Sequence, residues 1–404
     1  MDTQAALDRV SAKINAGEFG AARRLCTRFL EKNSADPAML QIAGMIEMHC
    51  GNAARAENFL LRSDAAIPNW NSRFILAYAL LAQVKFDQAM RVCDAALSLP
   101  GLTEREIYNA AEMKKDIVMV QRIRSEYRAG PSTATIRDPW EQKAVNDLTN
   151  IARRAIPAAT FFHIDRNDKH PFVKKAVDYR ATLIASLNAF RKSNPNASSI
   201  ILTDQSSDTS WLPEGVEVAR LEVELSHLMY SRMRCYRAFI LSGIVSGPVL
   251  FLDTDVCVQR NLSRVFDESF DIGLTYRTLP GTWHMPVNEG VIMSASGASS
   301  QAATFFGATL DTYEWFASQN WINERYGFDV RDWRGGQLSL NATINWEVPP
   351  FASGTSNVAG ARIKYFPGEE YNHAVTSKDD PHALAKKFAL HFKGAAKQLM
   401  GQSR

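Results

Sequence analysis

The sequence contains few cysteines and almost no excess charge of either sign. Its five cysteines are an odd number, are widely spaced in the 404 residues and form no Cys-x-x-Cys pair. This argues against a disulfide-stapled scaffold and is typical of small buried side chains in a reducing compartment. The 46 Lys and Arg residues nearly balance the 43 Asp and Glu residues, so we expect no nucleic-acid-binding surface.

The sequence also lacks a long apolar run and a secretory leader. The longest apolar stretch, residues 238–252, is interrupted by Ser, Gly and Pro and is too short to span a bilayer. Residues 1–4 (MDTQ) show neither a basic n-region nor an apolar h-region, so we expect no secretory signal. The expected location is the cytoplasm, with peripheral contact at the inner face of the membrane as an alternative.

Residues 1–127 have a helical and repetitive pattern. Ala22, Ala56 and Ala89 occupy equivalent positions of three similar segments and are spaced by 34 and 33 residues. This is the period of the tetratricopeptide repeat, a helix-turn-helix unit, and a small residue there lets two helices pack closely. An irregular helical bundle is the alternative. A stack of about three such repeats presents a concave surface that can hold a peptide or another protein.

The remainder of the chain changes its rhythm after a stretch rich in Gly, Pro, Ser and Thr, which indicates a linker. Beyond it, apolar strand patterns alternate with helical ones, which is typical of an α/β domain with a mostly parallel sheet. We expect strands over 161–164, 199–203 and 216–223 and helices over 140–155, 172–190 and 229–244.

The predicted division of the chain has three parts. Tetratricopeptide-like helical repeats occupy residues 1–128, and a linker with a connecting helix occupies residues 129–157. The α/β domain occupies residues 158–404. Each of the two domains is long enough to bury its own core.

Residues 249–256 (VLFLDTDV) run from an apolar strand into two carboxylates. A continuous apolar run predicts a strand buried on both faces, and side chains at i and i+2 of a strand point the same way. Asp253 and Asp255 should therefore converge at the carboxyl end of a strand, where open α/β sheets bind ligands. Close carboxylates repel unless a cation lies between them, and Mg²⁺ or Mn²⁺ binds such oxygens together with substrate phosphates. The pattern predicts a metal-diphosphate site, and a chance pair of solvated carboxylates is the alternative.

Five short motifs carry a resemblance to a known family by their order. They are YSRM (230–233), the strand with Asp-x-Asp (249–255), NEGV (288–291), GQLSLN (336–341) and His-x-x-Gly-x-x-Lys (391–397). Together they resemble the retaining glycosyltransferases of the glycogenin and lipopolysaccharide-galactosyltransferase type. The resemblance extends from about residue 160 to the end of the sequence, and its most specific part is the combination of the two charged motifs.

The resemblance implies a GT-A fold, which is an α/β domain that binds a nucleotide-diphospho-sugar, here a UDP-sugar, with Mn²⁺ or Mg²⁺. It implies that Asp253, Asp255 and His391 are metal ligands, and an imidazole among them favours Mn²⁺. Gly394 would let the backbone approach the diphosphate, and Lys397 would pair with its oxygens. A structural histidine is the alternative for His391.

The same resemblance implies further donor-site residues. Arg232 matches an arginine on the helix before Asp-x-Asp, although its interval to Asp253 is about one helical turn longer, and a surface role is the alternative. Asn288 belongs to a donor-binding motif, and Gln337 would lie beside the reacting carbon. Asp165 is singled out by its position and not by the resemblance: it follows the first strand, at a carboxyl edge of the sheet, and would contact a nucleoside or cap the following turn.

Two positions depart from the family pattern. Glu289 stands where the family has a small alanine, and Gly336 stands where it has an aspartate that holds the donor sugar. If the resemblance holds, the role of the missing carboxylate would fall to Glu289, from across the site, or to Asp332, one turn earlier than Gly336. Trp283, in a loop rich in Pro and Gly, is a candidate for acceptor contact, with packing on the domain as the alternative.

These residues predict a metal-dependent retaining glycosyltransferase. It would move a sugar from a UDP-sugar to a hydroxyl of a glycan, lipid-linked glycan or protein acceptor, by same-face attack with the leaving phosphate as proton acceptor. The alternative is a repeat-based scaffold whose degenerate transferase domain senses nucleotide sugars. The repeats are expected to hold a protein partner, and neither nucleic-acid binding nor a transmembrane segment is expected.

Overall fold

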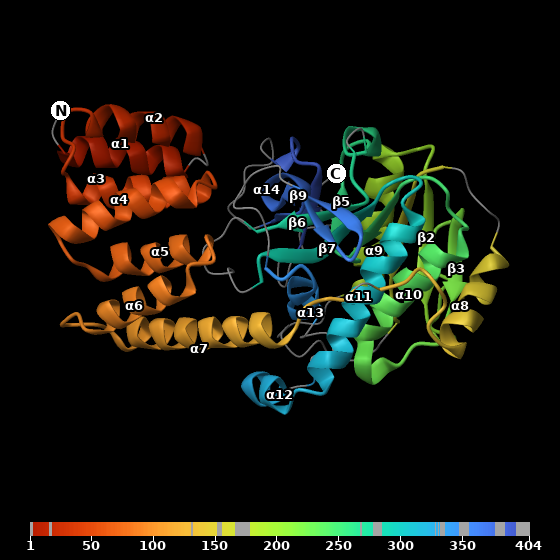
Figure 1. Ribbon diagram of the computed structural model, residues 1–404. Helices are drawn as coiled ribbons and strands as arrows, with labels where there is room; N and C mark the ends of the chain where they lie inside the picture. Colours follow the sequence, from red (N-terminus) through yellow and green to blue (C-terminus); the bar gives the residue numbers. More distant parts are fainter. Residues whose placement is uncertain are drawn as a thin grey trace. The chain divides into compact units, whose positions relative to one another are not determined.

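The chain divides into two compact units in the computed structural model (Figure 1). One unit is centred on Met1–Tyr127, and the other comprises Arg128–Arg277, Val287–Val348 and Ser353–Arg404. The residues described are 3–15, 18–130, 132–151, 156–165, 178–266, 269–277, 285–327, 329, 331, 336–346, 355–375 and 384–392.

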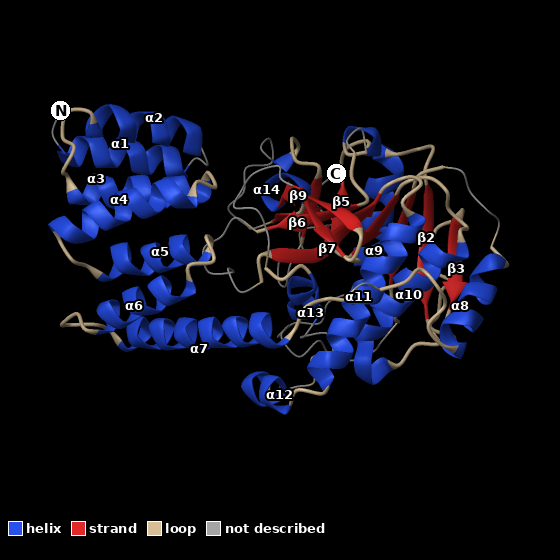
Figure 2. Cartoon of the chain, viewed as in Figure 1, coloured by secondary structure: helices blue, strands red, loops and turns tan. Residues whose placement is uncertain are grey.

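The first unit is helical throughout its described main segment (Figure 2). Successive helices pack as pairs, α1 with α2, α3 with α4 and α5 with α6, and the long helix α7 packs on α6. This confirms a helical N-terminal region, while its identity as tetratricopeptide repeats stays a prediction. The bounds are α1 Thr3–Asn15, α2 Phe19–Leu30, α3 Pro37–His49, α4 Ala53–Ala66, α5 Trp70–Leu81, α6 Phe86–Leu97 and α7 Glu104–Glu126.

Small residues allow these helices to approach one another. Ala22, Ala56 and Ala89 are fully buried, one in each of α2, α4 and α6. A Cβ on Gly44 of α3 would lie 2.5 Å from the side chain of Leu60 on α4, so only glycine permits that helix contact. The repeated small positions of the sequence are therefore packing positions.

The second unit is built on an eight-stranded sheet with the order β3-β2-β1-β4-β7-β6-β9-β8. Strands β3, β2, β1, β4, β6 and β9 run in one direction, and β7 and β8 run in the other. The sheet is therefore mixed and mostly parallel, which confirms the predicted α/β class. The bounds are β1 Ala158–Phe162, β2 Ser198–Thr203, β3 Val216–Arg220, β4 Val249–Leu252, β6 Ile272–Tyr276, β7 Val287–Ser294, β8 Thr355–Val358 and β9 Ala361–Pro367.

Helices cover both faces of the central strand β4. Leu250 and Leu252 share a buried core with residues of α9. Phe251, which points the other way, lies 4.4 Å from the Tyr236 ring on α10 and 5.3 Å from the Phe306 ring on α11, measured between centroids. The apolar run thus marks a strand buried on both sides. The helices of this unit are α8 Pro139–Thr149, α9 Tyr179–Ser193, α10 Leu228–Ser242, α11 Ser299–Ala317, α12 Asn320–Tyr326, α13 Gly336–Thr343 and α14 Gly368–Tyr371.

A second, small sheet with the order β10-β11-β5 brings a late segment of the chain to the end of β4. Its strands are β5 Val256–Val258, β10 His373–Ala374 and β11 Ala389–His391. In the antiparallel pairing of β11 with β5, His391 lies opposite Val256. The amide of Phe392 also donates to the carbonyl of Asp255 at 2.9 Å. This pairing places His391 next to the two aspartates.

Several expected boundaries are wrong. The helix expected over 140–155 ends at Thr149, and the one expected over 229–244 ends at Ser242. The first strand ends at Phe162 instead of continuing to residue 164, and the third ends at Arg220 instead of 223. Strand β4 ends at Leu252, so Asp253 and Asp255 follow it in a turn instead of alternating along one strand. The backbone reverses there because the amide of Val256 donates to the carbonyl of Asp253 at 3.2 Å.

The described part of the predicted linker packs on the second unit. Arg237 of α10 donates to the carbonyls of Thr133 and Thr135 at 2.7 and 2.8 Å. Arg137 forms an ion pair with Asp311 of α11 at 2.6 Å. Side chains of the α/β unit therefore hold this segment in place.

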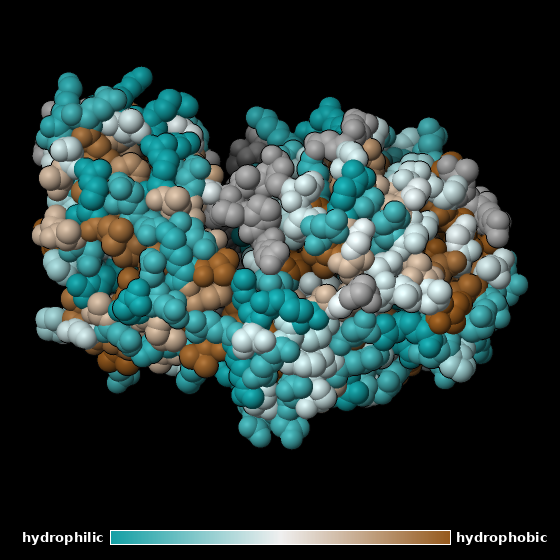
Figure 3. Space-filling model, viewed as in Figure 1, coloured by the Kyte–Doolittle hydropathy of each residue, from teal (hydrophilic) through white to brown (hydrophobic). Residues whose placement is uncertain are grey.

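The described surface is mostly hydrophilic on the face drawn in Figure 3. Some large apolar side chains are nevertheless exposed, including Tyr108 and Val118 of α7. No helix among the described residues is both long and apolar enough to cross a membrane.

Candidate metal and donor site

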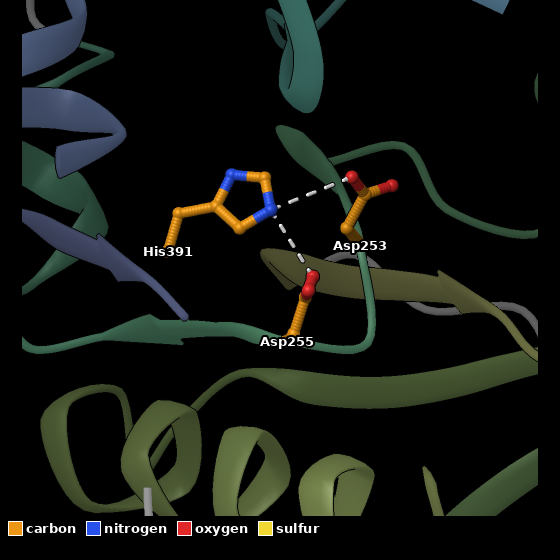
Figure 4. Close-up of side chains that lie close together, drawn as sticks. All are labelled: Asp253, Asp255 and His391. Carbon is orange, nitrogen blue, oxygen red and sulfur yellow. Dashed lines mark ion pairs between the residues drawn. The ribbon is translucent and has the colours of Figure 1, made fainter. Parts of the chain in front are cut away.

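Three side chains converge where β4 and β11 end (Figure 4). Nε2 of His391 lies 3.2 Å from Oδ1 of Asp255 and 3.9 Å from Oδ2 of Asp253. Asp255 and His391 are buried, whereas the side chain of Asp253 is 29% exposed. Of these three side chains, Asp253 is therefore the one most open to solvent.

The surrounding backbone fixes the imidazole ring of His391. A Cβ on Gly290 of β7 would lie 2.8 Å from Cε1 of His391, so glycine leaves the space that the ring fills. On the other side, Nδ1 of His391 lies 2.9 Å from Oδ1 of Asn372. The ring is thus held with Nε2 directed at the two carboxylates.

The donor set of this group fits a divalent cation. One ligand atom from each of Asp253, Asp255 and His391 can be chosen so that all lie within 4.8 Å of one another. Two ligands about 2.1 Å from one ion lie at most ~4.2 Å apart, and both distances from Nε2 fall within that limit. Two carboxylates with one imidazole suit Mn²⁺ better than Mg²⁺. The role of these residues as metal ligands stays a prediction.

Arg232 of α10 joins Asp253 to the sheet. Its Nη1 lies 2.7 Å from Oδ1 of Asp253, and its Nη2 contacts Oε2 of Glu289 on β7. The guanidinium is buried, which by itself would lower its pKa, but the charges of Glu289 and Asp253 raise the pKa above its usual range. Arg232 is therefore not a surface residue, and it contacts Oδ1 of Asp253, whereas His391 lies nearer to Oδ2.

Glu289 is a buried carboxyl group with unused hydrogen-bonding capacity. Burial raises its pKa to about 7, although the charge of Arg232 lowers it. Among the described residues, Oε1 of Glu289, Nε of Arg232 and the hydroxyl of Tyr313 lack hydrogen-bond partners. The charge of Glu289 also raises the pKa of Tyr313, after the larger effect of burial. Buried unpaired polar atoms cost about 1–3 kcal/mol each, so the cluster carries an energetic cost that a hydrogen-bonding partner would relieve.

Asn288 and Asp165 have local partners. The side chain of Asn288 accepts from the amide of Gly290 at 2.7 Å and so shapes β7 beside His391. The carboxylate of Asp165 is paired with Arg180, which also contacts Asp208 at 3.1 Å. A part for either residue in donor binding stays a prediction.

Several predicted residues lie outside the described part of the chain. Gln337 and Gly336 are in the first turn of α13, but their side-chain surroundings are not described. Asp332, Gly394, Lys397 and the loop residue Trp283 are outside the described residues altogether.

Sequence reasoning missed Asn372 and the pairing of Arg232 with Glu289. Asn372 follows the four-residue helix α14, in a segment with no motif or periodicity that distinguishes it. Arg232 and Glu289 are 57 residues apart, and only the departure of Glu289 from the family pattern was a signal. Both features arise where separate elements meet.

Comparisons with known proteins find similarity only among solved structures. No family model and no curated protein matches the chain. Matching structures include the galactosyltransferase LgtC with donor and acceptor sugar analogs, at 13% identity and TM-score 0.35 over 61% of this chain and 95% of that one. The glycosyltransferase GlyE of Streptococcus pneumoniae TIGR4 matches at 12% identity and TM-score 0.38, over 61% of this chain and 60% of that one. A glycosyltransferase involved in glycosylation of the major capsid of PBCV-1 matches at 12% identity and TM-score 0.35, over 61% of this chain and 99% of that one.

All three of these neighbours are glycosyltransferases. Identities and TM-scores this low do not decide the function of this chain. Its function is therefore inferred from its own site residues.

Proposed function

We propose that the second unit is a GT-A domain and that the protein is a metal-dependent retaining glycosyltransferase. It moves a sugar from a UDP-sugar to a hydroxyl of a glycan, lipid-linked glycan or protein. The observation that carries the proposal is the convergence of Asp253, Asp255 and His391. They meet at the carboxyl end of a central strand, where α/β sheets of this kind bind ligands.

In this proposal Asp253, Asp255 and His391 hold Mn²⁺, with Mg²⁺ as the alternative. A cation bound there supplies positive charge that stabilises the diphosphate leaving group. The turn that carries the aspartates is anchored because the hydroxyl of Ser186 on α9 donates to the carbonyl of Thr254 at 2.8 Å. By resemblance, Gly394 and Lys397 bind the same diphosphate.

The sugar side of the proposed site is formed by Arg232 and Glu289. Arg232 orients Asp253, and Glu289 balances the charge of Arg232. Glu289 thereby takes the place of the family carboxylate that is missing at Gly336, with Asp332 as the alternative. Gln337 lies beside the reacting carbon in this proposal. The acceptor hydroxyl attacks from the face that the phosphate leaves, and the phosphate takes its proton.

The outer parts of the proposed donor site are Asn288, beside the sugar, and Asp165, on the nucleoside. The pairing of Asp165 with Arg180 gives this end of the site both a carboxylate and a guanidinium. Both groups can hydrogen-bond a nucleoside.

For the first unit we propose tetratricopeptide-like repeats over residues 1–128, followed by a connecting segment over 129–157 and the transferase over 158–404. The regular spacing of fully buried Ala22, Ala56 and Ala89 supports this. The repeats would hold a protein partner or the acceptor. A cytoplasmic location, with contact at the inner membrane face as the alternative, completes the proposal.

The test is release of UDP from a panel of UDP-sugars by the full-length protein with Mn²⁺. We compare the wild type with Asp255→Ala and with a matched control, Asp147→Ala, whose carboxylate is on α8 and pairs only with Lys143 among the contacts described. We expect turnover of one donor by the wild type and the control. Loss of a partner of a metal ligand costs about 10–100-fold, so loss of a ligand should reduce turnover by at least ~100-fold. Equal turnover by Asp255→Ala would overturn the metal assignment.

The rival function is a scaffold with a nucleotide-sugar-sensing domain, and the departures at Gly336 and Glu289 from the family pattern favour it. It predicts that Mn²⁺ with UDP raises the melting temperature without sugar release from any donor or acceptor. Binding at 100 times the dissociation constant stabilises by about 2.7 kcal/mol, which a melting experiment detects.

A further inference from the structure

Helix α7 presents a regular stripe of side chains on the face that points away from the core of its unit. It is the last helix of the first unit along the chain and forms the lower edge of that unit in the view of Figure 1. Its inner face packs through fully buried side chains such as Ile117 and Val120. The opposite face carries residues spaced alternately by four and three positions, which we call the outer stripe: Glu104, Tyr108, Ala111, Lys115, Val118 and Arg122.

The outer stripe is exposed and partly apolar. Tyr108 is 63% exposed and Val118 is 55% exposed, and Ile107, beside the stripe, is 47% exposed. Alternating spacings of four and three positions are those of the contact positions in a two-helix coiled coil, because they keep side chains on one side of a helix. The stripe therefore has the geometry to receive a second helix along its length.

The charges of α7 divide between its two halves. Positions 104–113 contain three carboxylates and one arginine, whereas positions 114–126 contain four cationic side chains and two carboxylates. Two copies of α7 that run in opposite directions would place the acidic half of each against the basic half of the other. Two parallel copies in register would instead set Glu104 against Glu104 and Arg122 against Arg122. The charge pattern thus favours a second copy of this chain, in the antiparallel direction.

One register of the antiparallel pair matches both charge and polarity. With a two-fold axis at the level of Met113, Glu104 of one copy faces Arg122 of the other, and Tyr108 faces Val118. A two-fold contact forms each of these pairs twice, because residue i meets residue j and j meets i. The contact therefore has an apolar pair and an opposite-charge pair on either side of its axis.

The remaining stripe positions fit the same register. Ala111 faces Lys115 of the other copy, and a small residue leaves space for the apolar stem of lysine. Lys115 contacts Glu112 of its own helix at 2.8 Å, and Arg122 contacts Glu126 of its own helix at 2.6 Å. Neither cation is thus brought into the contact as an unpaired charge. A guanidinium has donors enough for two carboxylates.

We propose that the outer stripe is the contact of a homodimer in which two α7 helices pack antiparallel about a two-fold axis. From Glu104 to Arg122 the contact is about 27 Å long at 1.5 Å per residue. A single pair of helices is small beside the roughly 1,600 Å² of a standard stable interface, so we expect a reversible dimer. This inference does not depend on the proposed transferase function.

The test is sedimentation equilibrium of the full-length protein over a range of concentrations, with the melting temperature as a check on folding. Val118→Glu places a carboxylate against Tyr108, and Arg122→Glu places one against Glu104. The double variant with Glu104→Arg and Arg122→Glu exchanges the two charges. The matched control is Arg9→Glu, the same substitution at an exposed position of α1.

We expect a reversible dimer for the wild type and for the control. Val118→Glu and Arg122→Glu should each raise the dissociation constant at least ~10-fold, because the two-fold axis repeats every unfavourable pair. The double variant should recover most of the affinity, since the exchanged charges attract each other again only in an antiparallel pair. Melting temperatures should stay close to the wild type, because the substituted positions are exposed.

Three results would overturn the proposal. A wild type that stays monomeric up to ~1 mM would leave the outer stripe to a different protein chain. A dimer that neither Val118→Glu nor Arg122→Glu weakens would use another surface. A double variant that dimerises no better than Arg122→Glu would exclude the antiparallel register.

Discussion

Two arginines of helix α10 are both buried and both paired with carboxylates, yet their surroundings differ. Arg237 is fully buried, and each of its three nitrogens reaches an acceptor: Nη1 contacts the carboxylate of Glu141, and Nε donates to the carbonyl of Ala303 at 2.9 Å. Nη2 donates to two further carbonyls. Arg232 instead bridges Asp253 and Glu289, and its Nε has no partner among the described residues.

This difference distinguishes a structural anchor from a residue of the proposed site. Folded proteins satisfy most buried polar groups, and Arg237 follows this rule while it ties the segment before α8 to the core. At Arg232, unpaired polar atoms remain beside a partly exposed carboxylate. The predictions below test this contrast.

The largest effect on stability is expected for Arg237→Met. Removing one partner of a buried ion pair leaves the other charge unpaired and costs about 3–5 kcal/mol. We expect a large drop in the melting temperature of the full-length chain. The double variant with Glu141→Leu should recover most of it, because both charges are then gone. A melting temperature close to the wild type in the single variant would contradict the anchor role.

A smaller loss of stability is expected for Arg232→Met, about 1–3 kcal/mol. The cost is lower because burial already raises the pKa of Glu289 to about 7, so the carboxyl takes up a proton with little penalty near neutral pH. The same change should weaken Mn²⁺ binding by about 10–100-fold, since Asp253 loses its orienting partner. The matched control, folded Arg237→Met, should bind Mn²⁺ like the wild type. Equal Mn²⁺ affinity in Arg232→Met and Arg237→Met would show that the two arginines do not differ in their effect on the proposed metal site.

Glu289→Gln should change how stability depends on pH. The pKa of Glu289 rises from 4.5 to about 7 on folding because of burial. A raised carboxyl pKa favours the folded state fully below pH ~4.5, and this contribution is lost as the pH rises to about 7, at most about 1.4 kcal/mol per unit. The stability of the wild type relative to the variant should therefore fall across this window. The measurement is thermal or denaturant unfolding of both proteins between pH 5 and 8. A difference in stability between wild type and Glu289→Gln that does not change with pH would refute the prediction.

The smallest effect is expected for Arg234→Met on the same helix. Arg234 pairs with Asp138 at 2.6 Å and lies over the ring of Trp140 at 4.0 Å, and its side chain is 20% exposed. Such partly exposed contacts contribute about 1 kcal/mol. Melting and Mn²⁺ binding should both remain close to the wild type. A loss as large as that of Arg237→Met would show that burial does not rank these arginines.

The elements of the fold were predictable to different degrees. The continuous apolar run before Asp253 predicted a strand buried on both faces, and β4 lies between α9 on one side and α10 and α11 on the other. The apolar pattern of a strand reflects its burial and can be read from the sequence, because the pattern is a local property of the chain. The same pattern did not show that β4 ends at Leu252, because strand ends depend on where neighbouring strands stop pairing.

The candidate site was predictable only in part. Motif order singled out Asp253, Asp255 and His391, which lie together in the structure, while their role as ligands remains to be tested. The resemblance singled out Arg232 among three arginines within six residues of α10, but nothing in the sequence predicted that Arg232 pairs with Asp253 or that Arg237 is the buried anchor. Each of the three gives the same local signal, an arginine on a helix. Their partners come from strands and segments that are distant in the sequence.

The sequence alone determined the division into a helical N-terminal region and a region of alternating strands and helices, since both depend on local apolar patterns. Only the tertiary structure decided which side chains meet. Asn372 beside His391, Glu289 beside Arg232 and Glu141 beside Arg237 are contacts between residues 19, 57 and 96 positions apart. Contacts of this kind leave no local pattern, because they form when whole elements pack and their polar groups must find partners away from water.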